Sequence, residues 1–177
     1  MRCFLAIELS EEVKTELLKI QEILKEEIIG KFVEKENLHL TLKFFGELDK
    51  DEVNKVKNEL KKAKFEKVVC SLGRTGFFPN NKFINVVWVS LEPRDEINRL
   101  KEEIEKVLEN SGQEKKFECH VTLVRVKKVK DKLSLLKKVQ DLKIKPDCFE
   151  VKDFVLKKST LTSEGPVYED IERFALS

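Results

Sequence analysis

Apolar residues recur along this chain with two different periods, which together predict alternating helices and strands. Spacings of three and four residues place side chains on one face of a helix, and they occur in four stretches. The apolar residues of these four stretches are Val13, Leu17, Ile20 and Leu24; Val53, Val56 and Leu60; Ile97, Leu100, Ile104 and Val107; and Leu133, Leu136 and Val139. Runs rich in β-branched and aromatic residues predict strands at 3–9, 32–33, 38–45, 68–72, 83–91, 117–126, 144–156, 159–162 and 167–176.

Polar residues and glycines predict where these helices begin and end. Short polar side chains accept hydrogen bonds from the first free amides of a helix, whereas glycine commonly follows the last turn. The residues expected to start three of the helices are Ser10, Asp49 or Asp51, and Asp131. We expect Gly30 to end the first helix and Ser111–Gly112 to end the third.

The same order of elements occurs twice: strand, long helix, strand, short helix, strand. The tetrad His39-Leu40-Thr41-Leu42 lies in the middle strand of the first copy, and His120-Val121-Thr122-Leu123 follows 81 residues later, counted from 39 to 120. We therefore expect an internal duplication with halves at roughly 1–80 and 81–177. The predicted fold is α+β, with two pseudo-symmetric lobes that each contain an antiparallel sheet with helices on its outer side. The two motif strands should face a central cleft.

Composition supports one folded unit and limits the classes of function. Hydrophobic residues make up 41% of the 177 residues, and no linker-like segment separates the halves, so we expect a single domain over 1–177. The formal net charge is only +2, so any anion-binding site must be local. No signal peptide is recognisable, and no apolar stretch approaches the roughly 18 residues needed to cross a bilayer. We expect a cytoplasmic protein that does not bind membranes.

The four cysteines do not suggest a metal site or a disulfide framework. None forms a C-x-x-C pair, and their spacings fit no zinc signature. Cys119 directly precedes His120, which raises the question of a nucleophilic thiol. Because neighbouring residues in a strand point to opposite faces, Cys119 should point away from the imidazole.

The two tetrads suggest acid–base chemistry on an anionic group. Alternation along the first motif strand places His39, Thr41, Lys43 and Phe45 on one face, and the intervening apolar residues on the other. In each copy an imidazole then lies beside a hydroxyl. One neutral and one protonated histidine can act as base and acid, and two threonine hydroxyls can hold an anion between them. This combination suits in-line displacement at a phosphodiester without a metal ion.

Other interpretations of the histidines remain open from the residues alone. A single histidine on a strand is often structural, but two in matching tetrads on matching elements are harder to explain in that way. A metal site would need a third ligand, and none recurs near either motif. A module that binds RNA ends without turnover is a further alternative, although binding alone does not require two titratable groups.

The paired tetrads resemble those of the 2H phosphoesterases. The wider sequence is similar to the family of RNA 2′,3′-cyclic phosphodiesterases, also called 2′-5′ RNA ligases, at 1–8, 36–46, 77–80, 120–127 and 165–169. The chain also departs from the family pattern, including a segment near 158–164 that is individual to it. Lys31-Phe32-Val33 stands where family members often have Arg-Trp-Val, and Cys119 stands where a proline commonly precedes the second histidine.

The resemblance implies an activity and a role for each motif residue. A 2′,3′-cyclic phosphate at an RNA 3′ end, of tRNA or another RNA, would be hydrolysed to a 2′-phosphate, with a 2′-5′ linkage formed if an RNA 5′-hydroxyl attacks instead of water. His39 would be the proton donor and His120 the proton acceptor, with Thr41 and Thr122 binding phosphate oxygens. No cofactor or metal is implied, and we expect a monomer. Phosphodiesterases of small cyclic nucleotides or of 2′-5′ oligonucleotides are the alternative within this fold.

Four further residues are weaker candidates for the site. Arg125 fits the family pattern as a phosphate ligand, although strict alternation points it away from His120 unless a bulge intervenes. Lys43, Phe45 and Tyr168 are candidate RNA contacts. A basic run follows the second motif, and it is either a solvated face or a contact for the RNA backbone. Its members are Arg125, Lys127, Lys128, Lys130 and Lys132.

Overall fold

The computed structural model describes residues 1–109 and 117–177, which form an α+β fold built on one curled antiparallel sheet. In chain order the elements are β1 (Arg2–Glu8), α1 (Glu11–Lys25), β2 (Ile28–Phe32), the 3-10 turn η1 (Lys35–Asn37), β3 (His39–Glu47), α2 (Lys50–Lys62), β4 (Val68–Pro79), β5 (Ile84–Glu92), α3 (Arg94–Val107), β6 (His120–Val129), α4 (Lys132–Asp141), β7 (Phe149–Val151), β8 (Asp153–Leu161) and β9 (Pro166–Ala175). Within the described residues, no helix is long and apolar enough to cross a membrane.

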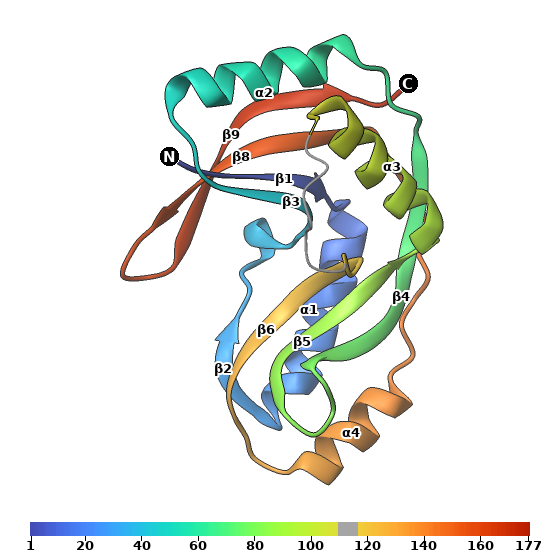
Figure 1. The fold of residues 1–177 in the computed structure, drawn as a ribbon. Helices are drawn as coiled ribbons and strands as arrows, with labels where there is room; N and C mark the ends of the chain where they lie inside the picture. Colours follow the sequence, from blue (N-terminus) through green and yellow to red (C-terminus); the bar gives the residue numbers. More distant parts are fainter. Residues whose placement is uncertain (110–116) are drawn as a thin grey trace.

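Two lobes are visible along this sheet (Figure 1). The strand order is β7-β4-β5-β6-β3-β1-β8-β9, with β2 paired to the far part of β6. We call β3, β1, β8 and β9 lobe A, and β2, β4, β5, β6 and β7 lobe B. The predicted two-lobed α+β class is confirmed. One detail differs, because the motif strands β3 and β6 are hydrogen-bonded neighbours rather than strands that face each other across a cleft.

The two lobes do not coincide with the two halves of the sequence. In lobe A, β1 from the first half pairs with β8 from the second half. In lobe B, β4 from the first half pairs with β5 from the second. We propose that the chain is a single domain that arose by duplication, since exchanged strands leave neither half with a complete sheet.

The helices cover one face of the sheet and bury its apolar side chains. Helix α1 packs against β2 and β6, α3 against β5, and α2 against β9. Leu40 and Val121, at the centres of the two motif strands, are fully buried on this side. The opposite face, which we call the open face, therefore carries the histidine and threonine of each tetrad.

Local signals predicted the starts of three helices correctly. The Ser10 hydroxyl accepts from the amide of Val13, and the Asp49 carboxylate accepts from the amides of Asp51 and Glu52 in a full capping box. Asp131 caps α4. The predicted third-helix end at 111–112 lies outside the described residues.

The prediction for Gly30 is wrong. Helix α1 ends at Lys25, and Gly30 lies within β2. A Cβ atom there would lie 2.3 Å from the carbonyl oxygen of Arg125, so this position needs glycine for close strand pairing rather than for a helix end.

The predicted strand at 144–156 begins later than expected and is divided between two strands. Only Phe149–Val151 and the first part of β8 are extended there, and no regular structure precedes them after α4.

Candidate active site

The two motif strands meet at one pair of residues in the middle of the sheet. Leu40 of β3 pairs with Val121 of β6 in an antiparallel bridge. In antiparallel strands, a step forward in one strand is a step back in the other. Each histidine therefore lies across from the threonine of the other tetrad, and all four polar side chains share the open face.

Both imidazoles are fixed by the same backbone contact. The Nδ1 atom of His39 lies 2.6 Å from the carbonyl oxygen of Asn37, and that of His120 lies 2.6 Å from the carbonyl oxygen of Glu118. A carbonyl can only accept, so Nδ1 carries a hydrogen in each ring. Nε2 is then the nitrogen free to exchange a proton, and this holds for both copies.

The two rings differ at Nε2. In His39, Nε2 lies 3.0 Å from the hydroxyl of Thr41, which donates to it when the ring is neutral. The Nε2 atom of His120 has no hydrogen-bond partner among the described residues. The two copies of the motif therefore differ in the hydrogen bonding of Nε2, the atom that would move a proton in each.

Burial favours the neutral form of both histidines. It lowers the pKa of His39 to about 4, with the Asn37 carbonyl opposing this and the positive charges of Lys157 and His120 adding to it. Burial also lowers the pKa of His120, against the opposing effect of the Glu118 carbonyl. In the free protein near neutral pH both rings are neutral.

Aromatic side chains bracket each imidazole. His39 lies 5.2 Å from the ring of Phe4 and 5.4 Å from that of Tyr168, which meets it edge to face at 89°. His120 has the corresponding neighbours Phe78, at 4.9 Å and 88°, and Trp88, at 6.1 Å. These contacts restrict ring rotation and exclude water from one side of each ring. Of the aromatic neighbours, sequence reasoning had placed only Tyr168 near the site.

A bulge puts the residues after the first tetrad on the opposite face from the one predicted. The register between β1 and β3 shifts at Leu42, so alternation restarts there. Lys43 is only 6% exposed and lies 3.9 Å from Glu105 of α3, and Phe45 packs against the core. The expectation that Lys43 and Phe45 share the open face with the first histidine is therefore wrong. Phe44 is there instead, and it is 72% exposed.

The second tetrad is followed by the same bulge. The register between β5 and β6 shifts at Leu123, so Val124 turns into the core and Arg125 turns to the open face. Burial is the main influence on both neighbouring groups, since it lowers the pKa of His120 and raises that of Tyr168. The charge of Arg125 acts on both groups as a smaller effect, which agrees with this orientation. The bulge that the sequence analysis required for Arg125 is present. Phe44 and Arg125 occupy equivalent positions, each five residues after its histidine.

A network of charged side chains lies behind His39. Glu8 is the register partner of His39, and its carboxylate accepts from Lys157 at 2.7 Å and from Arg173 at 2.6 Å. Asp170 accepts from the same two cations, each at 2.6 Å. The Lys157 ammonium is thus buried but fully paired, which makes this network rigid.

The structure also places the remaining candidates. Cys119 points into the core, where burial raises the pKa of its thiol to about 12, so it is not a nucleophile at neutral pH. No group of three potential metal ligands occurs within residues 1–109 and 117–177.

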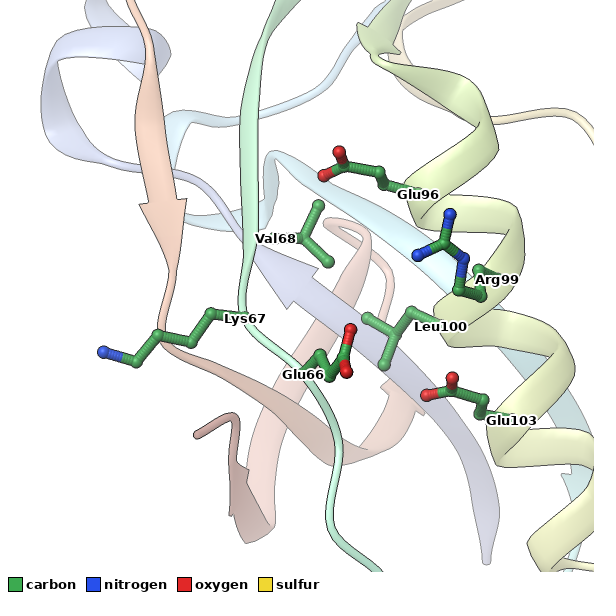
Figure 2. A pocket seen from close by; sticks show the side chains of 7 residues that line it. All are labelled: Glu66, Lys67, Val68, Glu96, Arg99, Leu100 and Glu103. Atoms are coloured by element: carbon green, nitrogen blue, oxygen red, sulfur yellow. The ribbon is translucent and has the colours of Figure 1, made fainter.

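A shallow pocket of about 120 Å³ lies elsewhere, between α3 and the start of β4 (Figure 2). It is lined by Glu66, Lys67, Val68, Glu96, Arg99, Leu100 and Glu103. It contains none of the predicted site residues.

Known proteins resemble this chain over nearly its whole length. The sequence matches the family described as LigT like Phosphoesterase over residues 7–88 and again over 89–168. A Methanocaldococcus jannaschii protein named RNA 2′,3′-cyclic phosphodiesterase is 37% identical, over 98% of this chain and 100% of its own length. A Methanothermobacter thermautotrophicus protein of the same name is 34% identical, over 99% of both chains.

Solved structures of similar proteins share the fold. A crystal structure of a Thermus thermophilus protein superposes with a TM-score of 0.80 at 29% identity, over 99% of this chain and 98% of that one. The apo form of Escherichia coli LigT superposes with a TM-score of 0.78 at 23% identity, over 99% and 97%. The resemblance to the 2H phosphoesterases is confirmed, and this chain belongs to the LigT-like phosphoesterase family.

Proposed function

We propose that this protein hydrolyses a 2′,3′-cyclic phosphate at the 3′ end of RNA and leaves a 2′-phosphate. The observation that carries the proposal is the pair of imidazoles on one open face, each fixed at Nδ1 and each beside a hydroxyl. The relatives at 37% and 34% identity are named for this activity.

The reaction requires one proton to be taken up and one to be given. His120 takes a proton from water through its lone pair at Nε2 as the water oxygen attacks phosphorus. The P–O3′ bond breaks opposite the attacking oxygen, and His39 delivers its Nε2 proton to O3′. The P–O2′ bond remains, so the products are a 2′-phosphate and a 3′-hydroxyl. The choice of donor and acceptor follows the family resemblance, because the symmetry of the motifs does not distinguish them.

The substrate itself supplies the charge that lets His39 act as an acid. A phosphate anion about 4 Å from the imidazolium stabilises it by about 4 kcal/mol at an effective dielectric constant near 20. That energy corresponds to raising the pKa of His39 by about 3, from about 4 in the free protein to near neutrality. Binding and protonation are therefore coupled.

Three side chains are suited to hold the phosphate. The hydroxyls of Thr41 and Thr122 lie on the open face beside the two imidazoles and can donate to non-bridging oxygens. Arg125 is exposed on the same face and adds a permanent positive charge.

Phe44 takes the role that the sequence had suggested for Phe45. Its ring lies 6.0 Å from that of Phe4, and most of its surface is free to stack on a base. Tyr168 is half-buried against His39 and Phe4, so its contribution is to support the imidazole ring.

The same machinery accounts for ligation. If an RNA 5′-hydroxyl replaces water as the nucleophile, the same bond to O3′ breaks and a 2′-5′ phosphodiester forms. The energy comes from the strained cyclic phosphate, so no nucleotide cofactor is needed.

We also infer that the protein acts as a monomer in the cytoplasm. All four cysteines are unpaired, and three of them are buried, which fits a reducing compartment.

The test is turnover of a defined oligoribonucleotide that ends in a 2′,3′-cyclic phosphate, with and without EDTA. Equal turnover in both conditions supports acid–base catalysis by the histidines, and loss of activity with EDTA refutes it. A cyclic mononucleotide assayed in parallel decides the substrate class. A higher kcat/KM for the mononucleotide would favour the small-nucleotide alternative, and E. coli LigT has been solved with 3′-AMP.

A further inference from the structure

Positive charge on the open face is distributed unevenly between the lobes. In lobe A, Lys157 and Arg173 are neutralised, because both bind Glu8 and Asp170. Arg173 also lies 3.1 Å from Asp153. These two cations therefore face three carboxylates, and the surface beside them does not attract a polyanion.

In lobe B, a line of cations along β2 and β6 has no such partners. Arg125, Lys31 and Lys127 are exposed, and none lies within 4.0 Å of a carboxylate of the described residues. Lys31 is the register partner of Arg125 across the two strands. Its ammonium donates to the carbonyl of Glu164 at 2.6 Å, a neutral acceptor that leaves its charge uncompensated.

Arg125 and Lys127 follow one another along β6 in the direction that leads away from the histidines. Val126 packs against the core, and the register between β2 and β6 shifts at Lys127. Lys127 is exposed on the side opposite Val126, so it lies on the open face, two residues beyond Arg125. Two residues of a strand span about 7 Å. That distance is close to the separation of successive phosphates along an extended nucleic-acid strand, so each side chain can meet one phosphate.

The carboxylates nearest His120 do not cancel this charge. Glu92 binds Arg94 at 3.1 Å, and Glu118 lies 3.8 Å from the same guanidinium. Both carboxylates are thus paired with Arg94 near the start of β6, whereas Lys127 lies near its end.

We propose that the RNA upstream of the cyclic phosphate lies over lobe B along β6, with its backbone phosphates against Arg125, Lys31 and Lys127. This rests on the proposed function, since it assigns the path of the same substrate. It implies that Lys127 contributes to binding of RNA chains but not to the reaction at the terminal nucleotide.

The experiment compares Lys127→Glu with two charge-matched controls, Lys158→Glu in lobe A and Arg74→Glu in β4. Arg74 is exposed and lies 5.9 Å from the ring of Trp88, so it marks the alternative path on the other side of His120. Each variant is assayed with an oligoribonucleotide and with a mononucleotide, both carrying the 2′,3′-cyclic phosphate, over a range of salt concentrations.

Lys127→Glu is expected to raise KM for the oligoribonucleotide several-fold and to leave the mononucleotide kinetics unchanged. The slope of log(kcat/KM) against log[salt] should fall by about 0.7, the value for one contact to a single-stranded phosphate. An unchanged slope, an equal loss on the mononucleotide, or a larger effect of Arg74→Glu or Lys158→Glu would overturn the proposed path.

A binding measurement separates failure of the path from failure of the proposed function. The affinity for a labelled oligoribonucleotide ending in a 2′-phosphate needs no catalysis. Absence of turnover by the unmodified protein refutes the proposed function, whereas equal affinity of the unmodified protein and Lys127→Glu refutes the path.

Discussion

The coupling of substrate binding to the charge of His39 makes a sharp prediction about pH. In the free protein the pKa of His39 is about 4, and the pKa of His120 is also below its ordinary value of 6.5. Acid–base catalysis needs His39 protonated at Nε2 and His120 neutral, so the two Nε2 atoms together carry one proton. Both pKa values lie below 6.5, so this form is most abundant in mildly acid solution.

The expected profile of kcat/KM is therefore a bell with its maximum below pH 6.5. Above the higher pKa, each pH unit lowers the singly protonated population tenfold, and kcat/KM falls with it. The profile of kcat extends to higher pH, because bound phosphate raises the pKa of His39 by about 3.

Proton NMR can measure both titrations directly, because the chain contains only two histidines. The two imidazole C2–H signals are assigned by replacing one histidine at a time. The titration is then repeated with an RNA 2′-phosphate bound. A free-protein pKa of His39 at or above 6.5, or no rise when the phosphate binds, would refute the coupling.

Three further predictions concern single substitutions. His39→Ala and His120→Ala should each lower kcat at least about 100-fold, as expected when a general acid or base is lost; near-normal turnover in either variant would contradict its role. Phe44→Ala should weaken RNA binding by roughly 1–3 kcal/mol, measured from Kd. It should leave unfolding unchanged, whereas the control Phe45→Ala should lower the free energy of unfolding. Gly76→Ala should destabilise the fold by roughly 1–3 kcal/mol in chemical denaturation, since its Cβ would lie 2.1 Å from the Trp88 ring; unchanged stability would show that the ring can move freely.

Much of the candidate site was predictable because its signals are local. The two histidines and two threonines were identified from a repeated tetrad, and alternation placed them on one face correctly as far as Leu42. Caps at Ser10 and Asp49 depend on contacts within a few residues, so sequence alone was enough to place them.

The residues beyond each tetrad could not be placed in this way. The bulges at Leu42 and Leu123 depend on register against β1 and β5, which are distant in the sequence. A one-residue shift moves every later side chain to the other face, which is why Lys43 was misplaced and Phe44 was missed. The pairing of β3 with β6 and the exchange of strands between the lobes are likewise long-range features with no local pattern.

The central claim is that two histidines open the cyclic phosphate at the bond to O3′. The most direct measurement is to let the protein, without metal, hydrolyse a 2′,3′-cyclic phosphate RNA in ¹⁸O-labelled water and to identify the terminal group. The expected products are a 2′-phosphate that carries the label and an unlabelled 3′-hydroxyl. A 3′-phosphate product, or label in the hydroxyl, would contradict it.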